Sequence, residues 1–315
     1  MSDALQIREL QKSYGKRRAL NGLNLTVARG SILGLVGANG AGKTTMMSIC
    51  CGLLQPDGGA VDLLGEGEFN PVKHAGRVTI LPQDSRLPLH ARVADLLYFY
   101  GQLQGVAKSV LPQQIEQLLS WVNLGDRAKS PVKSLSHGMM RRLTVAQAFL
   151  GEPELIFLDE PMSGLDPREV ARMRELLVQR RGKQTIVISS HVLTELEALC
   201  DTIAFIDKGR LLKQDSLSAI VRHHHRVTYR LRPGGPVPLA ALGNAVIGAE
   251  WNLSANGIEL SALLVDGAGQ LADINAKVLP LLLQAGVAIE EIRRGSDLES
   301  EFLAATEPPP LPPAT

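Results

Sequence analysis

Apolar residues over the first two thirds of the chain alternate between short continuous runs and stripes at helical spacing. The continuous runs predict buried strands at residues 31–36, 78–81, 155–158, 185–188 and 203–206, followed by a short strand at 210–213. The helical stripes are Ile115/Leu118/Leu119/Val122 and Val170/Met173/Leu177. This alternation of strands and helices predicts an α/β core.

The pattern changes after the three histidines at residues 223–225, which we interpret as a linker, with metal binding as the alternative. Residues 227–231 alternate apolar and polar side chains, as a half-buried strand does. A strand near 258–260, a helix at 271–283, a strand at 287–293 and a last helix opened by a capping box at 296–299 should follow. We therefore predict a first domain at 1–222, a small α+β accessory domain at 226–305 and a disordered Pro-rich tail at 306–315.

Length and charge narrow the classes of function. The chain has 315 residues, enough for two domains, and its 33 Lys+Arg balance 32 Asp+Glu to a net charge of +1. A nucleic-acid-binding protein would usually show a basic excess, so no nucleic-acid partner is expected. The three cysteines, Cys50, Cys51 and Cys200, lack metal-ligand spacing and are expected to be packed thiols in a reducing compartment. No signal region or apolar run of ~18 residues is found, so we expect a soluble, cytoplasmic protein.

The strongest motif lies at residues 37–44 and fits the phosphate-binding loop G-x-x-x-x-G-K-[ST]. Glycines let a backbone curl around an anion, Lys43 can reach the β- and γ-phosphates, and the Thr44 hydroxyl can bind Mg²⁺. A strand precedes the loop and a helix follows it, so the helix N-terminus faces the phosphates. The predicted nucleotide-binding residues here are Gly37, Ala38, Asn39, Gly40, Ala41, Gly42, Lys43, Thr44 and Thr45.

A carboxylate pair follows the buried run at 155–158. Asp159 should lie at the C-terminal tip of this strand, where ligands bind in open α/β sheets, and is expected to hold Mg²⁺. Glu160 comes one residue later and is suited to act as general base or to orient the attacking water. The alternative is an ordinary acidic pair at a helix N-terminus.

Between these two motifs stands Leu135-Ser136-His137-Gly138-Met139, and with it the chain resembles the ATP-binding-cassette (ABC) family over residues 4–220. The family usually has Leu-Ser-Gly-Gly-Gln here. The resemblance implies that Ser136 and Gly138 contact the γ-phosphate of an ATP held by a second cassette. His137 and Met139 depart from the usual motif, which leaves dimer affinity and turnover open.

The resemblance assigns further roles. It implies that Tyr14 stacks on adenine, that Gln83 senses Mg²⁺ and the water, and that His191 contacts the γ-phosphate and aligns Glu160. Asp166 falls in the loop that crosses the dimer interface. The expected catalytic residues are therefore Glu160, His191, Lys43, Gln83 and Asp166, and the expected metal ligands are Thr44, Gln83 and Asp159.

The resemblance implies a P-loop ABC ATPase core, with a mixed sheet and a helical subdomain at about 86–150. It further implies ATP and Mg²⁺ as cofactors, a second ABC subunit and separate transmembrane permease subunits as partners, and export of an unknown substrate. Such a chain would be peripheral on the inner face of the cell membrane. Residues 86–101 are expected to dock a membrane subunit, to form the core of the helical subdomain, or to do both. The alternatives are an importer ATPase, a soluble ABC protein acting on ribosomes or nucleic acid, and a non-hydrolysing nucleotide sensor.

Overall fold

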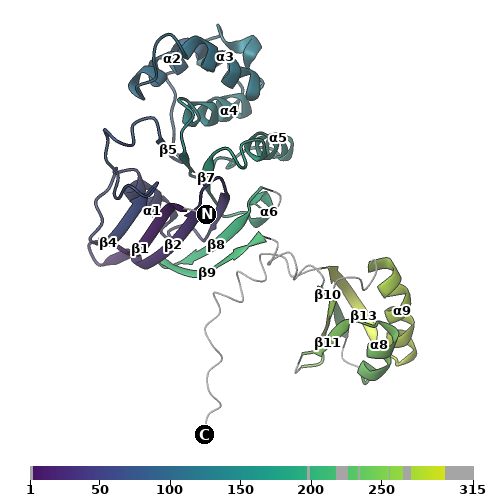
Figure 1. Cartoon of the computed structure of the whole chain (residues 1–315). Helices are drawn as coiled ribbons and strands as arrows, with labels where there is room; N and C mark the ends of the chain where they lie inside the picture. The colour runs from purple at the N-terminus through teal and green to yellow at the C-terminus, as the bar shows by residue number, and fades with distance from the viewer. Residues whose placement is uncertain are drawn as a thin grey trace. The chain divides into compact units, whose positions relative to one another are not determined.

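A computed structural model describes residues 3–196, 199–217, 226–232, 235–254, 256–264 and 271–294. The chain divides into two compact units, Met1–Ser216 and Leu217–Thr315 (Figure 1). The histidine linker, the helix expected from residue 296 and the Pro-rich tail lie outside the described residues. The exact domain boundaries stay predictions, and each unit is described by itself below.

The first unit is built on a six-stranded sheet. Its strand order is β5 (Val78–Leu81), β6 (Leu155–Leu158), β7 (Thr185–Ser190), β3 (Ile32–Val36), β8 (Thr202–Asp207) and β9 (Arg210–Ser216). Neighbouring strands from β5 to β8 are parallel, and only β9 is antiparallel. Every residue of β3, β6 and β7 is buried, as expected for parallel strands covered on both faces. Because these three strands are neighbours, the loops at their C-terminal ends meet at one edge of the sheet.

A second, antiparallel sheet packs against the first and was not predicted from the sequence. Its order is β2 (Arg17–Ala28), β1 (Asp3–Tyr14) and β4 (Gly58–Leu63). Leucines of β1 and β2 share one apolar cluster with α1 (Lys43–Cys50) and with β3 and β6. Cys50 and Cys51 are free, buried thiols within this cluster, and Cys200 is also free and buried. The cysteines are therefore packed, as expected.

Helices form a separate layer of the first unit. Helices α2 (Val93–Leu103), α3 (Leu111–Trp121) and α4 (His137–Ala148) lie together, away from the antiparallel sheet (Figure 1). The predicted apolar stripe of α3 is turned inward, since Ile115, Leu118 and Leu119 are buried. The described residues of this unit also form α5 (Pro167–Val178), α6 (Leu193–Leu196) and short 3₁₀ turns at Gly125–Arg127 and Val132–Ser134.

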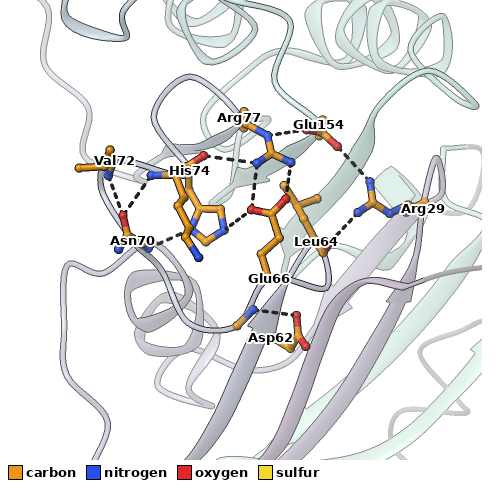
Figure 2. Close-up of polar contacts among 11 residues, drawn as sticks. Arg29, Asp62, Leu64, Glu66, Asn70, Val72, His74, Arg77 and Glu154 are labelled. Carbon is orange, nitrogen blue, oxygen red and sulfur yellow. Dashed lines mark hydrogen bonds and ion pairs between the residues drawn. The ribbon is translucent and has the colours of Figure 1, made fainter.

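A polar network ties the antiparallel sheet to the start of the parallel strands (Figure 2). Arg77, just before β5, binds Glu66 beyond β4 at 2.9 Å and Glu154 before β6 at 2.6 Å. Arg29, beyond β2, binds the other Glu154 oxygen at 2.9 Å and donates to the Leu64 carbonyl. The network joins the N-terminal ends of β5 and β6, opposite the edge that carries the predicted site.

The second unit has the order β10 (Arg226–Arg232), α8 (Leu239–Ala245), β11 (Ala249–Leu253), β12 (Glu259–Leu264), α9 (Leu271–Gln284) and β13 (Ala288–Arg294). Its strands form an antiparallel sheet ordered β11-β12-β10-β13, the βαββαβ arrangement of ferredoxin-like domains. Val227, Tyr229 and Leu231 pack with residues of both helices in one core. The predicted α+β fold of this region is confirmed. Within the described segments of both units, no helix is long and apolar enough to cross a bilayer.

Candidate active site

The phosphate loop connects β3 to α1, as predicted. Gly42 is the N-cap of α1 with a φ of 112°, and Gly40 has a φ of 85°, both in the region that favours glycine. A Cβ on Gly37 would lie 2.4 Å from the Ile206 carbonyl of β8. Glycine is therefore required at each of the three positions, and the resulting loop leaves the N-terminus of α1 open to an anion.

Lys43 is folded into this loop. Its side chain is almost completely buried, and its Nζ donates to the Gly37 carbonyl at 2.6 Å and to the Ala38 carbonyl at 3.3 Å. Nζ also lies 3.9 Å from a Glu160 oxygen. Burial lowers the pKa of Lys43, while the charges of Glu160 and Asp159 act in the opposite direction. The Lys43 ammonium is thus hydrogen-bonded to two neutral carbonyls and interacts electrostatically with the carboxylates of Glu160 and Asp159.

Asp159 lies at the tip of β6, 1% exposed, and is held from two sides. The Thr44 hydroxyl donates to one carboxylate oxygen at 2.6 Å, and the Ser189 hydroxyl of β7 donates to the other at 2.5 Å. Sequence reasoning missed Ser189. The only available signal was its place at the end of a buried strand, two residues before His191.

The Thr44 and Asp159 oxygens suit a magnesium ion. Mg²⁺ prefers hard oxygen ligands and usually takes one or two protein groups, completing its shell with phosphates and water. The described part of the chain contains no group of three or more His, Cys, Asp or Glu side chains that could enclose a metal without such help. The donor set therefore fits Mg²⁺ bound together with a phosphate, and does not form a closed structural metal site.

Three of the other predicted catalytic side chains, His191, Gln83 and Lys43, converge on Glu160. One carboxylate oxygen lies 3.3 Å from His191 Nδ1 and accepts from Gln83 Nε2 at 3.4 Å. The backbone of Glu160 has a φ of 46°, sparsely populated by non-glycine residues. Ser189 Oγ accepts from the Glu160 N–H at 2.8 Å, and Arg141 of α4 donates to the Glu160 carbonyl. These two bonds hold a strained residue in place; Arg141, too, was missed from the sequence.

Lys43, Thr44, Gln83 and Glu160 border one pocket of about 520 Å³, and Asp159 and His191 are linked to it through their contacts with Thr44 and Glu160. Tyr14, 49% exposed, stands in its wall as predicted for an adenine-stacking ring. Its lining is Tyr14, Arg17, Ala19, Asn39, Gly40, Gly42, Lys43, Thr44, Thr45, Gln83 and Glu160. Of the remaining loop residues, Ala41 is buried in the apolar core, whereas Gly37 and Ala38 hold Lys43. One site thus gathers the predicted residues from the strand ends and the phosphate loop.

Three further predicted residues lie at helix starts outside this pocket. Ser136 is the N-cap of α4, and its Oγ accepts from the Met139 N–H at 3.2 Å. Gly138 follows in the first turn, where a Cβ would come within 2.9 Å of Glu169. Asp166 caps α5 through two backbone N–H groups. The expected helix N-terminus at Ser136 is confirmed, and these residues belong to helix starts outside the pocket.

Known proteins resemble the chain in sequence and fold. The family model described as "ABC transporter" matches residues 20–163. The Nod factor export ATP-binding protein I of Ralstonia nicotianae is 36% identical over 224 residues, covering 70% of this chain and 69% of that protein. The protein of the same name from Burkholderia orbicola is 32% identical over 307 residues, covering 96% of each.

Solved structures agree. An ATP-binding subunit of an ABC transporter superposes with a TM-score of 0.61 at 27% identity, over 70% of this chain and 92% of that one. CbiO1 of Clostridium perfringens, part of the transporter complex cbiONQ, shows the same fold with a TM-score of 0.62 at 24% identity, over 70% and 91% of the two chains. The chain belongs to the ATP-binding proteins of ABC transporters and is an ABC-type ATPase that binds ATP.

Proposed function

We propose that this chain powers export through separate membrane subunits by hydrolysing MgATP in the pocket at the phosphate loop. The observation that carries the proposal is the convergence on Glu160. A buried carboxylate faces the pocket, with His191 and Gln83 at one oxygen and Lys43 near the other. A structural carboxylate would not need three polar side chains around it beside a nucleotide-sized pocket.

Binding would depend on the loop and on Tyr14. The backbone N–H groups of residues 39–44 and the N-terminus of α1 favour negative charge at the phosphates. Lys43 is close enough to exchange a loop carbonyl for a phosphate oxygen, since one of its two bonds is 3.3 Å long. The exposed Tyr14 ring offers a face on which adenine can stack.

Hydrolysis would depend on the orientation of Glu160. Its carboxylate can accept the proton of an attacking water, while His191 and Gln83 fix the direction in which the oxygen lone pairs point. Thr44 and Asp159 would hold the magnesium ion, with Gln83 near it. When bound, the ion would neutralise charge developing on the phosphate oxygens. Fixed dipoles and charges at these positions need no reorganisation during the reaction.

A second cassette would complete the site. Ser136 and Gly138 open a helix and do not line this chain's own pocket, and such an N-terminus can accept the γ-phosphate of an ATP bound elsewhere. Asp166 lies at the start of α5, beyond the turn that follows Glu160. We infer that two cassettes close over two ATP molecules and open after hydrolysis, which converts the reaction into motion.

Export is supported by the relatives named for Nod factor export. One of them matches over 96% of both chains, so the likeness includes the accessory unit and not only the cassette. The partners would be transmembrane subunits that hold the chain at the inner face of the membrane. Phe99 and Leu103 of α2, 54% and 68% exposed, are apolar groups available to such a partner.

The test is ATP turnover by the full chain co-purified with its membrane partner. Glu160→Gln should lower turnover at least 100-fold while ATP binding persists, because the carboxylate acts on the water. Glu116→Gln, on the exposed side of α3, is the matched control and should leave turnover unchanged. Unchanged turnover in Glu160→Gln would reject the proposal.

A further inference from the structure

Arg17 lines the nucleotide pocket and is not among the residues of the sequence motifs. It is the first residue of β2 and pairs directly with Tyr14 of β1 across the turn at Gly15 and Lys16. Directly opposed residues of antiparallel strands project to the same face of the sheet. Both side chains accordingly line the pocket. Arg17 is thus placed beside the expected adenine platform by the hairpin itself.

The guanidinium of Arg17 reaches from this hairpin to the phosphate loop. Its Nη2 lies 3.4 Å from the Gly40 carbonyl, beyond the usual range for a strong N–H···O bond. A Cβ on Gly40 would come within 2.4 Å of the same nitrogen, so the guanidinium lies directly on the loop. The side chain therefore spans the space between the base platform and the phosphate cradle.

Arg17 differs from other arginines of the same unit in its partners. Arg29, Arg77 and Arg142 each bind a carboxylate. Among the residues that the structure describes, the only recorded partner of Arg17 is the long contact to the Gly40 carbonyl. Lys43, the other cation of the pocket, already shares its charge with Glu160 and Asp159. Arg17 consequently presents a positive charge to the pocket, and no carboxylate of the described residues pairs with it.

We propose that Arg17 is a further nucleotide-binding residue, whose guanidinium donates to the phosphate chain of the nucleotide between Tyr14 and the loop. A guanidinium presents several donors in a planar fork that matches phosphate oxygens, and such charge-assisted bonds are stronger than one to a neutral carbonyl. Exchange of the weak Gly40 contact for phosphate is therefore favourable. The inference rests on the proposed ATP site at residues 37–44.

The experiment measures ATP affinity by titration calorimetry on the full chain and its variants. Arg17→Ala should raise the Kd for ATP about 10-fold or more and weaken its dependence on salt concentration, since one charge contact is lost. Arg17→Lys keeps the positive charge but lacks the planar guanidinium, so its Kd for ATP should lie between those of the wild type and Arg17→Ala. The control is Arg18→Ala, because Arg18 points away and binds Asn21 at 3.0 Å. Its Kd should stay within twofold of the wild type.

Turnover separates binding from catalysis. Arg17→Ala should raise KM and leave kcat at saturating ATP near the wild-type value, with the same melting temperature as Arg18→Ala when no nucleotide is added. A Kd for Arg17→Ala within twofold of Arg18→Ala overturns the inference. A lower melting temperature with an unaltered salt dependence of binding also overturns it, since that would indicate a structural role. If Lys43→Ala binds ATP like the wild type, the proposed site itself is wrong.

Discussion

Replacement of Ser189 by alanine tests whether the active carboxylates are held by the hydroxyl that the sequence did not reveal. Ser189 is fully buried in β7, and its hydroxyl joins the Asp159 carboxylate to the backbone N–H of Glu160, whereas Arg141 bonds only the backbone carbonyls of these two residues. It donates to the Asp159 carboxylate at 2.5 Å and accepts from the Glu160 N–H at 2.8 Å. Replacement by alanine removes both hydrogen bonds and reduces the side-chain volume only by the hydroxyl group.

The expected cost follows from these two bonds. Leaving a buried N–H without an acceptor costs about 1–3 kcal/mol, and a hydrogen bond to a charged group contributes about 1.5–3 kcal/mol. Because a single hydroxyl makes both, the two terms do not add fully, and we expect a loss of about 2–4 kcal/mol in the free energy of unfolding. For a unit of this size the melting temperature should fall by about 5–15 °C.

ATP turnover by Ser189→Ala should fall by more than its lower stability can explain. Thr44 still holds one oxygen of Asp159 in the variant, but the carboxylate can rotate and Glu160 loses the bond that supports its unusual φ of 46°. Removing the outer partner of a metal-binding carboxylate typically costs about 10–100-fold in activity or metal affinity. We expect a decrease in ATP turnover of this size at a temperature where the variant is fully folded.

The assay needs a stability control and a local reporter. Thr79→Val removes another buried hydroxyl, which donates to the Ala148 carbonyl at 2.7 Å, away from the pocket. The chain has two tryptophans, and with Trp251→Phe in every background the fluorescence of Trp121 follows the first unit alone. Turnover in Ser189→Ala that falls no further than in Thr79→Val would refute the reasoning.

Three further predictions concern catalysis and pH. A variant with Glu160→Asp should retain ATP binding but lose most turnover, because the shortened side chain withdraws from His191; calorimetry and phosphate release check this, and equal turnover contradicts it. Hydrogen bonds from Arg77 lower the pKa of Glu66 and that of Glu154 below the usual 4.5. The two ionised carboxylates therefore stabilise the fold above pH 4.5, and this stabilisation is lost as the pH falls through the lowered pKa values. Arg77→Met should flatten the unfolding profile there, and an unaltered acid limb would contradict it. Burial raises the pKa of Tyr229 to about 12, so the stability contributed by the protonated phenol is complete below pH 10 and is lost as the pH rises through 12. Tyr229→Phe should remove this alkaline loss of stability, as measured by urea unfolding. An equal loss in the variant would contradict the prediction.

The parallel strands could be predicted because both of their faces are buried, and a strand buried on both faces consists mostly of consecutive apolar residues. The predicted runs at 78–81 and 155–158 coincide with β5 and β6. The long hairpin of β1 and β2 left no such run. Its residues mix exposed and buried positions, and shifts in the pairing register interrupt the alternation that would indicate a strand.

The site divides in the same way. The phosphate loop and the Asp159–Glu160 pair are local motifs whose chemistry is complete within a few residues, and the structure brings them together as the sequence predicts. Ser189 and Arg141 act across the fold, from β7 and α4, and nothing in their own neighbourhood distinguishes them from an ordinary strand serine or helix arginine. Only the tertiary arrangement shows what they hold.

The central claim is that ATP is hydrolysed between two cassettes, and a mixing experiment tests it most directly. Lys43→Ala impairs the loop of one chain, whereas Ser136→Asp keeps α4 capped but places a negative charge where the other chain's phosphate would bind. Each variant alone, with its membrane partner, should be inactive. An equal mixture should recover about a quarter of the wild-type turnover, because half of randomly formed pairs contain one intact site. Full activity of Ser136→Asp alone, or no recovery on mixing, would contradict the account.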